Sequence, residues 1–157
     1  MSLSLLREFC AENFTDVPAA IEAGADRIEL CDNLAVGGTT PSAGVIGAAT
    51  VYAHEHGARV MTMIRPRGGD FVYGPAELQM MQSDIETACR LGTDGIVFGC
   101  LERREHGFWL DLSAIEALVA RVRWMQDQRD WSGVPREFDR EDQRIDITFH
   151  MAFDELV

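Results

Sequence analysis

The chain has 157 residues, 46% of them apolar and 25% charged, which fits one soluble globular domain long enough to bury a core. Its formal net charge of -12 repels phosphate backbones and anionic lipids, so we expect neither nucleic acid nor a membrane as a partner. No apolar run approaches the roughly 20 residues of a membrane span, and the amino terminus lacks a signal-peptide pattern, so we expect a cytoplasmic protein.

All 14 basic residues are arginine, and this restricts the chemistry that the chain can perform. Without lysine, a Schiff base through a lysine amine and a phosphate-loop lysine are both excluded. The four cysteines show no zinc-finger spacing, and in a reducing cytoplasm we expect free thiols.

Strand and helix patterns alternate along the chain. Strands are predicted at Leu5–Cys10, Arg27–Cys31, Arg59–Ile64, Gly95–Phe98 and Ile145–Phe149. Helices are predicted between them at Val17–Ala23, Ser42–His56, Pro75–Leu91 and Leu112–Gln128. This alternation, with short connections, predicts parallel strands joined by right-handed crossovers. Two α/β architectures fit: an open doubly wound sheet, or about the first five units of a (β/α)₈ TIM barrel.

A charged, aperiodic stretch at residues 127–144 precedes the fifth predicted strand. It is far longer than the ~4–6 residues typical of such connections. We interpret it as a long surface loop within a single, partial barrel domain that spans residues 1–157.

The run Val60–Phe71 passes from an apolar strand into two arginines, a proline, two glycines and an aspartate. The proline ends the strand, and the glycine pair allows a tight turn. Loops at the carboxyl ends of strands are where α/β proteins keep their functional sites. We therefore expect Arg65, Arg67 and Asp70 near such a site.

Several predicted strands have one apolar face and one face that becomes polar toward the carboxyl end. In a barrel the polar faces would point inward and converge near the mouth. The residues that would converge are Glu8, Cys10, Glu29, Cys31, Arg65, Arg67, Asp70, His150 and, just beyond, Asp154. The alternative interpretation is a buried ion-pair network that holds the barrel layers together.

Cys10 and Cys31 form a candidate metal site. Adjacent strands lie about 4.8 Å apart, so two cysteines on the same face of neighbouring strands could share one metal ion. Thiolates select soft ions such as Cu(I). The alternative is that both are small buried hydrophobic residues, as most free cysteines are.

Five groups of residues, in chain order, resemble the motifs of one known family. They are Glu8-Phe9-Cys10, Gly24–Cys31 with Gly37–Ser42, Met63–Phe71 with Tyr73, Asp94–Gly99, and Thr148–His150 with Ala152–Asp154. Together they are similar to the copper homeostasis protein CutC family. The resemblance runs from about Glu8 to Asp154, and Met63–Phe71 is its most characteristic part.

The resemblance implies a (β/α)₈ barrel, a cytoplasmic homodimer, and a Cu(I) site whose two cysteines correspond to Cys10 and Cys31. The chain departs from the family at Met151, where arginine is usual. It also stops after the fifth predicted strand, so we expect a C-terminally truncated member. Five strands cannot close such a barrel, and open edges would favour oligomers or a flattened sheet.

Three functions remain open at this point. The first is copper homeostasis with Cu(I) bound by Cys10 and Cys31. The second is a barrel enzyme of unassigned reaction acting on a small anion, with Glu29 and His150 as acid–base groups. Its anion-binding residues would be Arg65, Arg67, Asp70, Glu8 and Asp154. The third is an inactive remnant. The expected partners are a copper ion or small anionic molecule and other copies of the chain.

Overall fold

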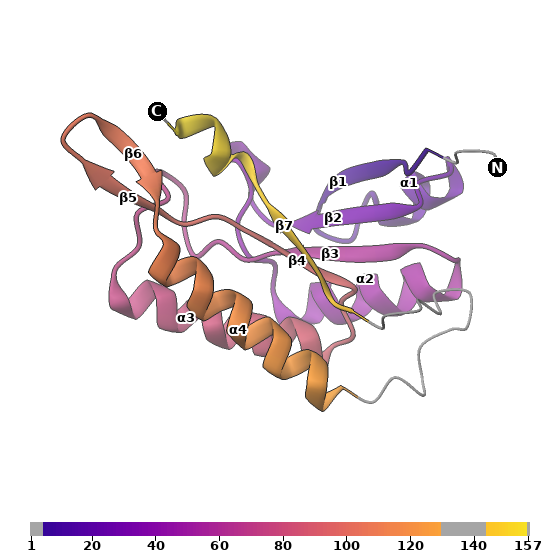
Figure 1. The fold of residues 1–157 in the computed structure, drawn as a ribbon. Helices are drawn as coiled ribbons and strands as arrows, with labels where there is room; N and C mark the ends of the chain where they lie inside the picture. Colours follow the sequence, from indigo (N-terminus) through magenta and orange to yellow (C-terminus); the bar gives the residue numbers. More distant parts are fainter. Residues whose placement is uncertain (1–4, 130–143, 157) are drawn as a thin grey trace.

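A five-stranded parallel sheet forms the centre of the computed structural model, which describes residues 5–129 and 144–156 (Figure 1). Its strands are β1 (Glu8–Glu12), β2 (Arg27–Cys31), β3 (Arg59–Met63), β4 (Gly95–Phe98) and β7 (Asp146–Phe149). They lie in the order β1-β2-β3-β4-β7, and every neighbouring pair is parallel. The predicted parallel α/β sheet is therefore confirmed, although β1 begins later than predicted and continues to Glu12.

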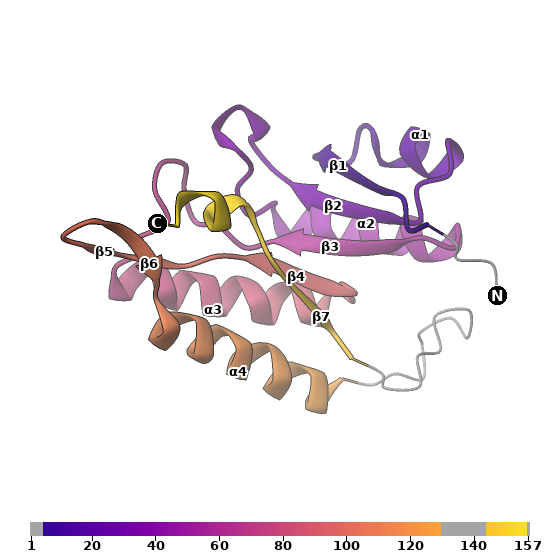
Figure 2. The same cartoon turned by 45° about the horizontal axis from the view of Figure 1, so that its top comes forward.

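The helices cover one face of this sheet. They are α1 (Val17–Glu22), α2 (Ala43–Glu55), α3 (Pro75–Arg90) and α4 (Leu112–Gln128). Figures 1 and 2 show α2, α3 and α4 lying along the same side of the strands, and α1 contacts α2. Two short 3₁₀ helices, η1 (Leu34–Val36) and η4 (Met151–Glu155), follow β2 and β7.

Two helices, α2 and α4, begin at a residue whose side chain caps them. The Ser42 hydroxyl accepts a hydrogen bond from the Val45 amide at 3.3 Å, and an Asp111 carboxylate oxygen accepts one from the Ala114 amide at 2.9 Å. Such bonds satisfy amides that have no partner within the helix. After α3 the chain turns at Gly92 with φ of 95°, a conformation that glycine adopts at low cost.

The two faces of the sheet are packed differently. Ile28, Leu30 and Val60 point into the main core between the sheet and the helices. On the other face, Cys31, Met61, Met63 and Val97 form a separate small cluster. This alternation follows from the two-residue period of a strand, and it sends every second side chain away from the helices.

A hairpin between β4 and α4 was not predicted. Residues of β5 (Leu101–Arg104) pair antiparallel with β6 (Gly107–Leu110). The Arg103 guanidinium lies 4.5 Å from the Phe108 ring centre, and that of Arg104 lies 4.9 Å from the Trp109 ring centre. These cross-strand contacts stabilise strands whose charged residues hide the usual apolar alternation.

The predicted loop at residues 127–144 begins too early, because Asp127 and Gln128 belong to α4. Most of the remainder lies outside the described residues. Within the described residues the sheet is open, with β1 and β7 at its edges, so a closed barrel is not seen. No helix in residues 5–129 and 144–156 combines the length and apolar character needed to cross a membrane.

Asp94 ties the start of β4 to β3 and α2, and its loss should destabilise the fold. Its buried carboxylate accepts a hydrogen bond from the Val60 amide at 2.8 Å and lies 2.9 Å from His54 Nε2. Asp94→Ala leaves that buried amide unpaired, so we expect a loss of about 2–4 kcal/mol in unfolding free energy. Urea denaturation measures it. Asp94→Asn, which keeps an acceptor oxygen, should lose less; equal stability of the alanine variant and the original protein would contradict this account.

Candidate functional site

Cys10, Glu29 and Cys31 form a cluster on the face of the sheet that the helices leave open. In the β1–β2 register Cys10 lies opposite Glu29, and Cys31 is two residues further along β2, so all three side chains share one face. The two sulfurs are 3.9 Å apart, and Glu29 Oε1 lies 3.8 Å from Cys10 Sγ and 4.0 Å from Cys31 Sγ. The structure therefore places the two predicted cysteines together and adds a carboxylate between them.

Both thiols of this cluster hold their protons tightly. Burial raises the pKa of Cys10, and the negative charge of Glu29 raises it further. Burial, together with the neighbouring Cys10 and Glu29, raises the pKa of Cys31 far above its ordinary value. Burial and the charge of Glu8 likewise raise the pKa of Glu29. A metal that binds here as a thiolate complex must displace protons.

The cluster is exposed on one side and enclosed on the other. Cys10 is exposed, whereas Cys31 is fully buried and contacts the apolar group of Met61, Met63 and Val97. The loop after β2 packs over Cys31, because a Cβ atom on Gly38 would lie 3.1 Å from Cys31 Sγ. An ion could approach from the exposed Cys10 side. Behind the cluster it would meet the buried side chains of Met61, Met63 and Val97.

A second group of polar side chains lies past the carboxyl ends of β3 and β7, and Arg65 is its centre. Arg65 is 2% exposed. Its terminal nitrogens donate to three backbone carbonyls, those of Val36 at 2.8 Å, Gly38 at 2.9 Å and Gly69 at 2.7 Å. Its guanidinium lies 4.7 Å from the Phe71 ring centre, and that ring is 4.9 Å from the His150 ring. Arg65 therefore links the loops after β2 and β3.

His150 is held neutral in this group. It is 7% exposed and packs so tightly on Gly99 that a Cβ atom there would lie 2.6 Å from the imidazole. Burial, and then the charge of Arg65, lower the pKa of His150 to about 4. Its Nδ1 accepts a hydrogen bond from the Ala152 amide at 3.2 Å, which assigns the proton to Nε2.

Tyr73 completes this group, although sequence reasoning did not propose it as a site residue. It is 8% exposed, and burial raises its pKa to about 12 despite the opposing charge of Arg65. The signals in the sequence were its place just after the charged loop and its inclusion with Met63–Phe71 in the family motif. We call Arg65, Phe71, Tyr73 and His150 the strand-end cluster.

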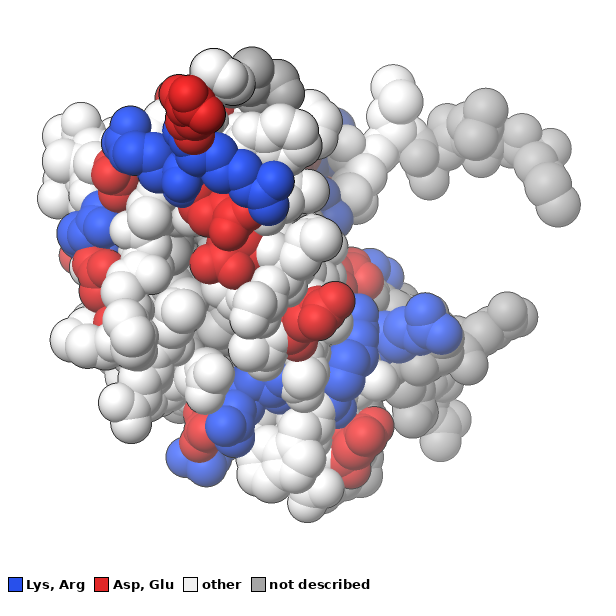
Figure 3. Space-filling model, turned by 60° about the vertical axis from the view of Figure 1, so that its left-hand side comes forward, with Lys and Arg blue, Asp and Glu red and all other residues white. Residues whose placement is uncertain are grey.

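The remaining predicted site residues lie outside this cluster, although Arg67 borders it. Arg67 pairs with Glu77 and with Asp70, and its guanidinium carbon lies 5.3 Å from the Tyr73 ring centre. Glu8 pairs with Arg27 at the first positions of β1 and β2, the opposite end of the strands from His150. Asp154 is exposed in η4. The expected single site thus separates into the cysteine cluster, the strand-end cluster and surface ion pairs. On the face shown in Figure 3, basic and acidic side chains lie next to one another.

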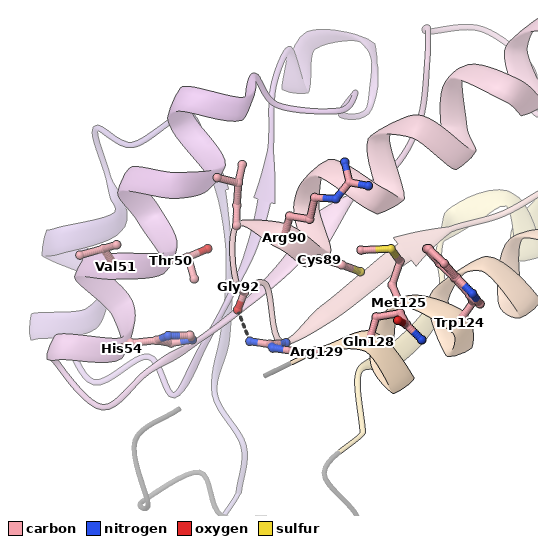
Figure 4. A pocket seen from close by; sticks show the side chains of 11 residues that line it. Thr50, Val51, His54, Cys89, Arg90, Gly92, Trp124, Met125, Gln128 and Arg129 are labelled. Atoms are coloured by element: carbon pink, nitrogen blue, oxygen red, sulfur yellow. Dashed lines mark hydrogen bonds between the residues drawn. The ribbon is translucent and has the colours of Figure 1, made fainter. Parts of the chain in front are cut away.

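A hollow on the helix side of the molecule was not anticipated. It has a volume of about 550 Å³ and lies between the ends of α2, α3 and α4. Figure 4 shows Thr50, His54, Cys89 and Trp124 around it, with Arg129 donating a hydrogen bond to the Gly92 carbonyl at 2.8 Å. It is lined by the helices and by the residues that follow α3 and α4, so it is separate from both clusters on the strands.

The neutral state of His150 predicts how stability depends on pH. Its folded pKa lies below the ordinary value of about 6.5, so the unfolded chain binds more protons between pH 6.5 and 4. Stability should therefore fall as the pH is lowered through this window, with a contribution from His150 on the order of 3 kcal/mol. Urea denaturation at a series of pH values measures it.

The variant His150→Gln should lose this part of the pH dependence. His106→Gln, in the exposed turn between β5 and β6, is the matched control and should keep the original slope. A parallel pH dependence for the original protein and His150→Gln would contradict the assignment of a buried neutral imidazole.

Comparisons with known proteins agree with the motifs. The model of the CutC family matches residues 5–126. A CutC family protein of Enterococcus faecalis is 52% identical over 152 residues, which cover 97% of this chain and 62% of the relative. A human protein named copper homeostasis protein cutC homolog is 38% identical over 149 residues, covering 95% of this chain and 45% of the relative.

A solved structure shows the same arrangement. The crystal structure of the putative copper homeostasis protein CutC from Streptococcus agalactiae has a TM-score of 0.78 and 45% identity, and the match covers 98% of this chain and 62% of that one. The chain thus spans less than two thirds of the length of these relatives. On the family match and these identities, the chain belongs to the CutC family.

Proposed function

We propose that this protein binds Cu(I) through the thiolates of Cys10 and Cys31 and serves in copper homeostasis. The observation that carries the proposal is the pair of sulfurs 3.9 Å apart on one face of adjacent strands. Metal–thiolate bonds of about 2.3 Å can span that separation with a bent sulfur–metal–sulfur angle. The names of the human and Streptococcus agalactiae relatives, which refer to copper homeostasis, support the same function.

The donor set suits Cu(I). The ligand atoms of this cluster come from two thiols and one carboxylate, which is one ligand fewer than a structural zinc site uses. Thiolates favour Cu(I), and the neighbouring side chains of Met61 and Met63 make the surroundings soft and apolar. Glu29 would act as a weak third ligand, or as a proton acceptor for the thiols.

The wider properties implied by the family are further proposals. We propose that the open sheet is part of a (β/α)₈ barrel, with further strands joining at the edges of β1 and β7. A homo-oligomer in the cytoplasm fits the same proposal. The unpaired backbone groups of two open edges give other strands a place to pair.

An enzyme acting on a small anion is the second candidate. It is supported by a buried arginine and a neutral histidine in the strand-end cluster. Its acid–base pair is weaker, because Glu29 on β2 and His150 after β7 are separated in the sheet by β3 and β4. Copper binding therefore remains the primary proposal.

Replacing both cysteines should abolish tight Cu(I) binding. We expect Cys10→Ser/Cys31→Ser to weaken the affinity at least 100-fold, because hydroxyl groups are poor ligands for a soft cation. An anaerobic titration in competition with a chromophoric Cu(I) chelator measures the change. Cys89→Ser, which alters a thiol in α3 outside the cluster, is the matched control. Unchanged affinity in the double variant would refute the proposed site.

Copper affinity should also increase with pH. Both thiols are protonated at neutral pH because their pKa values are raised, so binding releases up to two protons. The dissociation constant should then fall by up to about 100-fold per pH unit between pH 6 and 8. The single variant Cys10→Ser should roughly halve this slope on a logarithmic scale. An affinity that is independent of pH would show that thiolates do not hold the ion.

A further inference from the structure

Three polar groups of the strand-end cluster are buried without a hydrogen-bond partner. They are Arg65 Nε, the Tyr73 hydroxyl and His150 Nε2. Each belongs to a side chain that is more than nine-tenths buried. Since buried polar groups are almost always paired, three orphans in one group need an explanation.

All three groups can act as donors. Arg65 Nε–H makes no hydrogen bond within the protein, and the hydroxyl of Tyr73 can rotate its proton toward an acceptor. His150 carries its proton on Nε2, because Nδ1 accepts from the Ala152 amide. The Tyr73 oxygen is the one atom of the three that can also accept, and the charge of Arg65 acts on it, so the cluster offers more donors than acceptors.

Two of the groups belong to side chains that contact one aromatic ring. Phe71 lies 4.7 Å from the Arg65 guanidinium carbon and 4.9 Å, between ring centres, from His150. The charge of Arg65 acts on both Tyr73 and His150, so both lie within electrostatic range of the guanidinium. One small ligand could therefore face the arginine and its two neighbours.

The charge of Arg65 is the second argument. Among residues 5–129 and 144–156, the ion pairs do not include Arg65, and its terminal nitrogens meet only carbonyl dipoles. Arg67, two residues away, has two carboxylate partners although it is more exposed. A buried charge without a counter-charge is costly, so an anion at Nε would relieve both the charge and the unmade hydrogen bonds.

We propose that the strand-end cluster binds a small carboxylate through Arg65 Nε, the Tyr73 hydroxyl and His150 Nε2. A carboxylate carries one negative charge, which matches the single positive charge of Arg65, and accepts several hydrogen bonds through its two oxygens. A doubly charged phosphate would leave one negative charge uncompensated beside an uncharged imidazole and phenol. The site is distinct from the cysteine cluster and does not depend on copper binding.

The variant Tyr73→Phe separates an effect on ligand binding from an effect on the stability of the fold. It removes only a hydroxyl that has no partner, so in chloride buffer the free protein should be as stable as the original or more stable. With sodium acetate as the probe, the full chain should bind, and Tyr73→Phe should weaken the binding about tenfold. Tyr52→Phe, the other tyrosine, which stacks on His56 in α2, is the matched control and should bind acetate unchanged.

Nuclear magnetic resonance of the histidine side chains, at constant ionic strength, gives the direct readout. Acetate should shift the His150 Nε2 resonance and leave that of His106 in place. The absence of acetate binding, or binding that Tyr73→Phe does not weaken, would overturn the proposal. So would a loss of stability of Tyr73→Phe in chloride, which would show that the hydroxyl already has a partner. Binding of inorganic phosphate without binding of acetate would overturn the assignment to a carboxylate.

Discussion

The parallel register of the central sheet is the constraint on which both clusters depend, because it aligns Cys10 with Glu29 and sets the carboxyl ends of β3 and β7 at the same edge. Cys10 lies opposite Glu29 in this register. Since side chains alternate along a strand, every second residue of β1 and β2 faces away from the helices. The same alternation on β3 and β4 sends Met61, Met63 and Val97 to that face. A shift of one residue in either strand would bury the carboxylate in the main core and separate the sulfurs. Burial of the apolar side chains fixes the register of the strands. This register in turn brings Cys10, Glu29 and Cys31 together on the other face.

Burial then gives each cluster its chemical character. The cysteine cluster combines two thiols with nearby carboxylates, so its electrostatics favour protonated sulfur until a cation arrives. The strand-end cluster is the reverse case, a positive guanidinium beside an imidazole that cannot take a second charge. One accepts a soft cation and the other an anion, and both lie toward the carboxyl ends of parallel strands, where α/β proteins bind ligands.

The two clusters meet at the loop after β2. The Gly38 carbonyl accepts a hydrogen bond from Arg65, and the same residue packs on the sulfur of Cys31. Its φ of +88° suits glycine, which also leaves room for the sulfur. A change in the loop that alters one cluster would therefore reach the other through a rigid contact.

Periodicity and turn residues were enough to predict the parallel sheet, the four helices and the faces of the strands. The predicted strand faces made Cys10 and Cys31 a candidate pair, and the family motifs named the same two residues. These features are local, since they depend on spacing along one strand or helix.

The sequence missed the β5–β6 hairpin, whose strands are held by contacts between arginines and aromatic rings across the turn. It also could not separate Arg65 from Arg67, because only the fold decides which of the two meets carboxylates and which is buried among carbonyls. Tyr73 entered the site for the same reason. Its hydroxyl becomes a functional candidate only when the packing of distant segments leaves it buried beside Arg65 and His150, and that packing is a property of the tertiary structure.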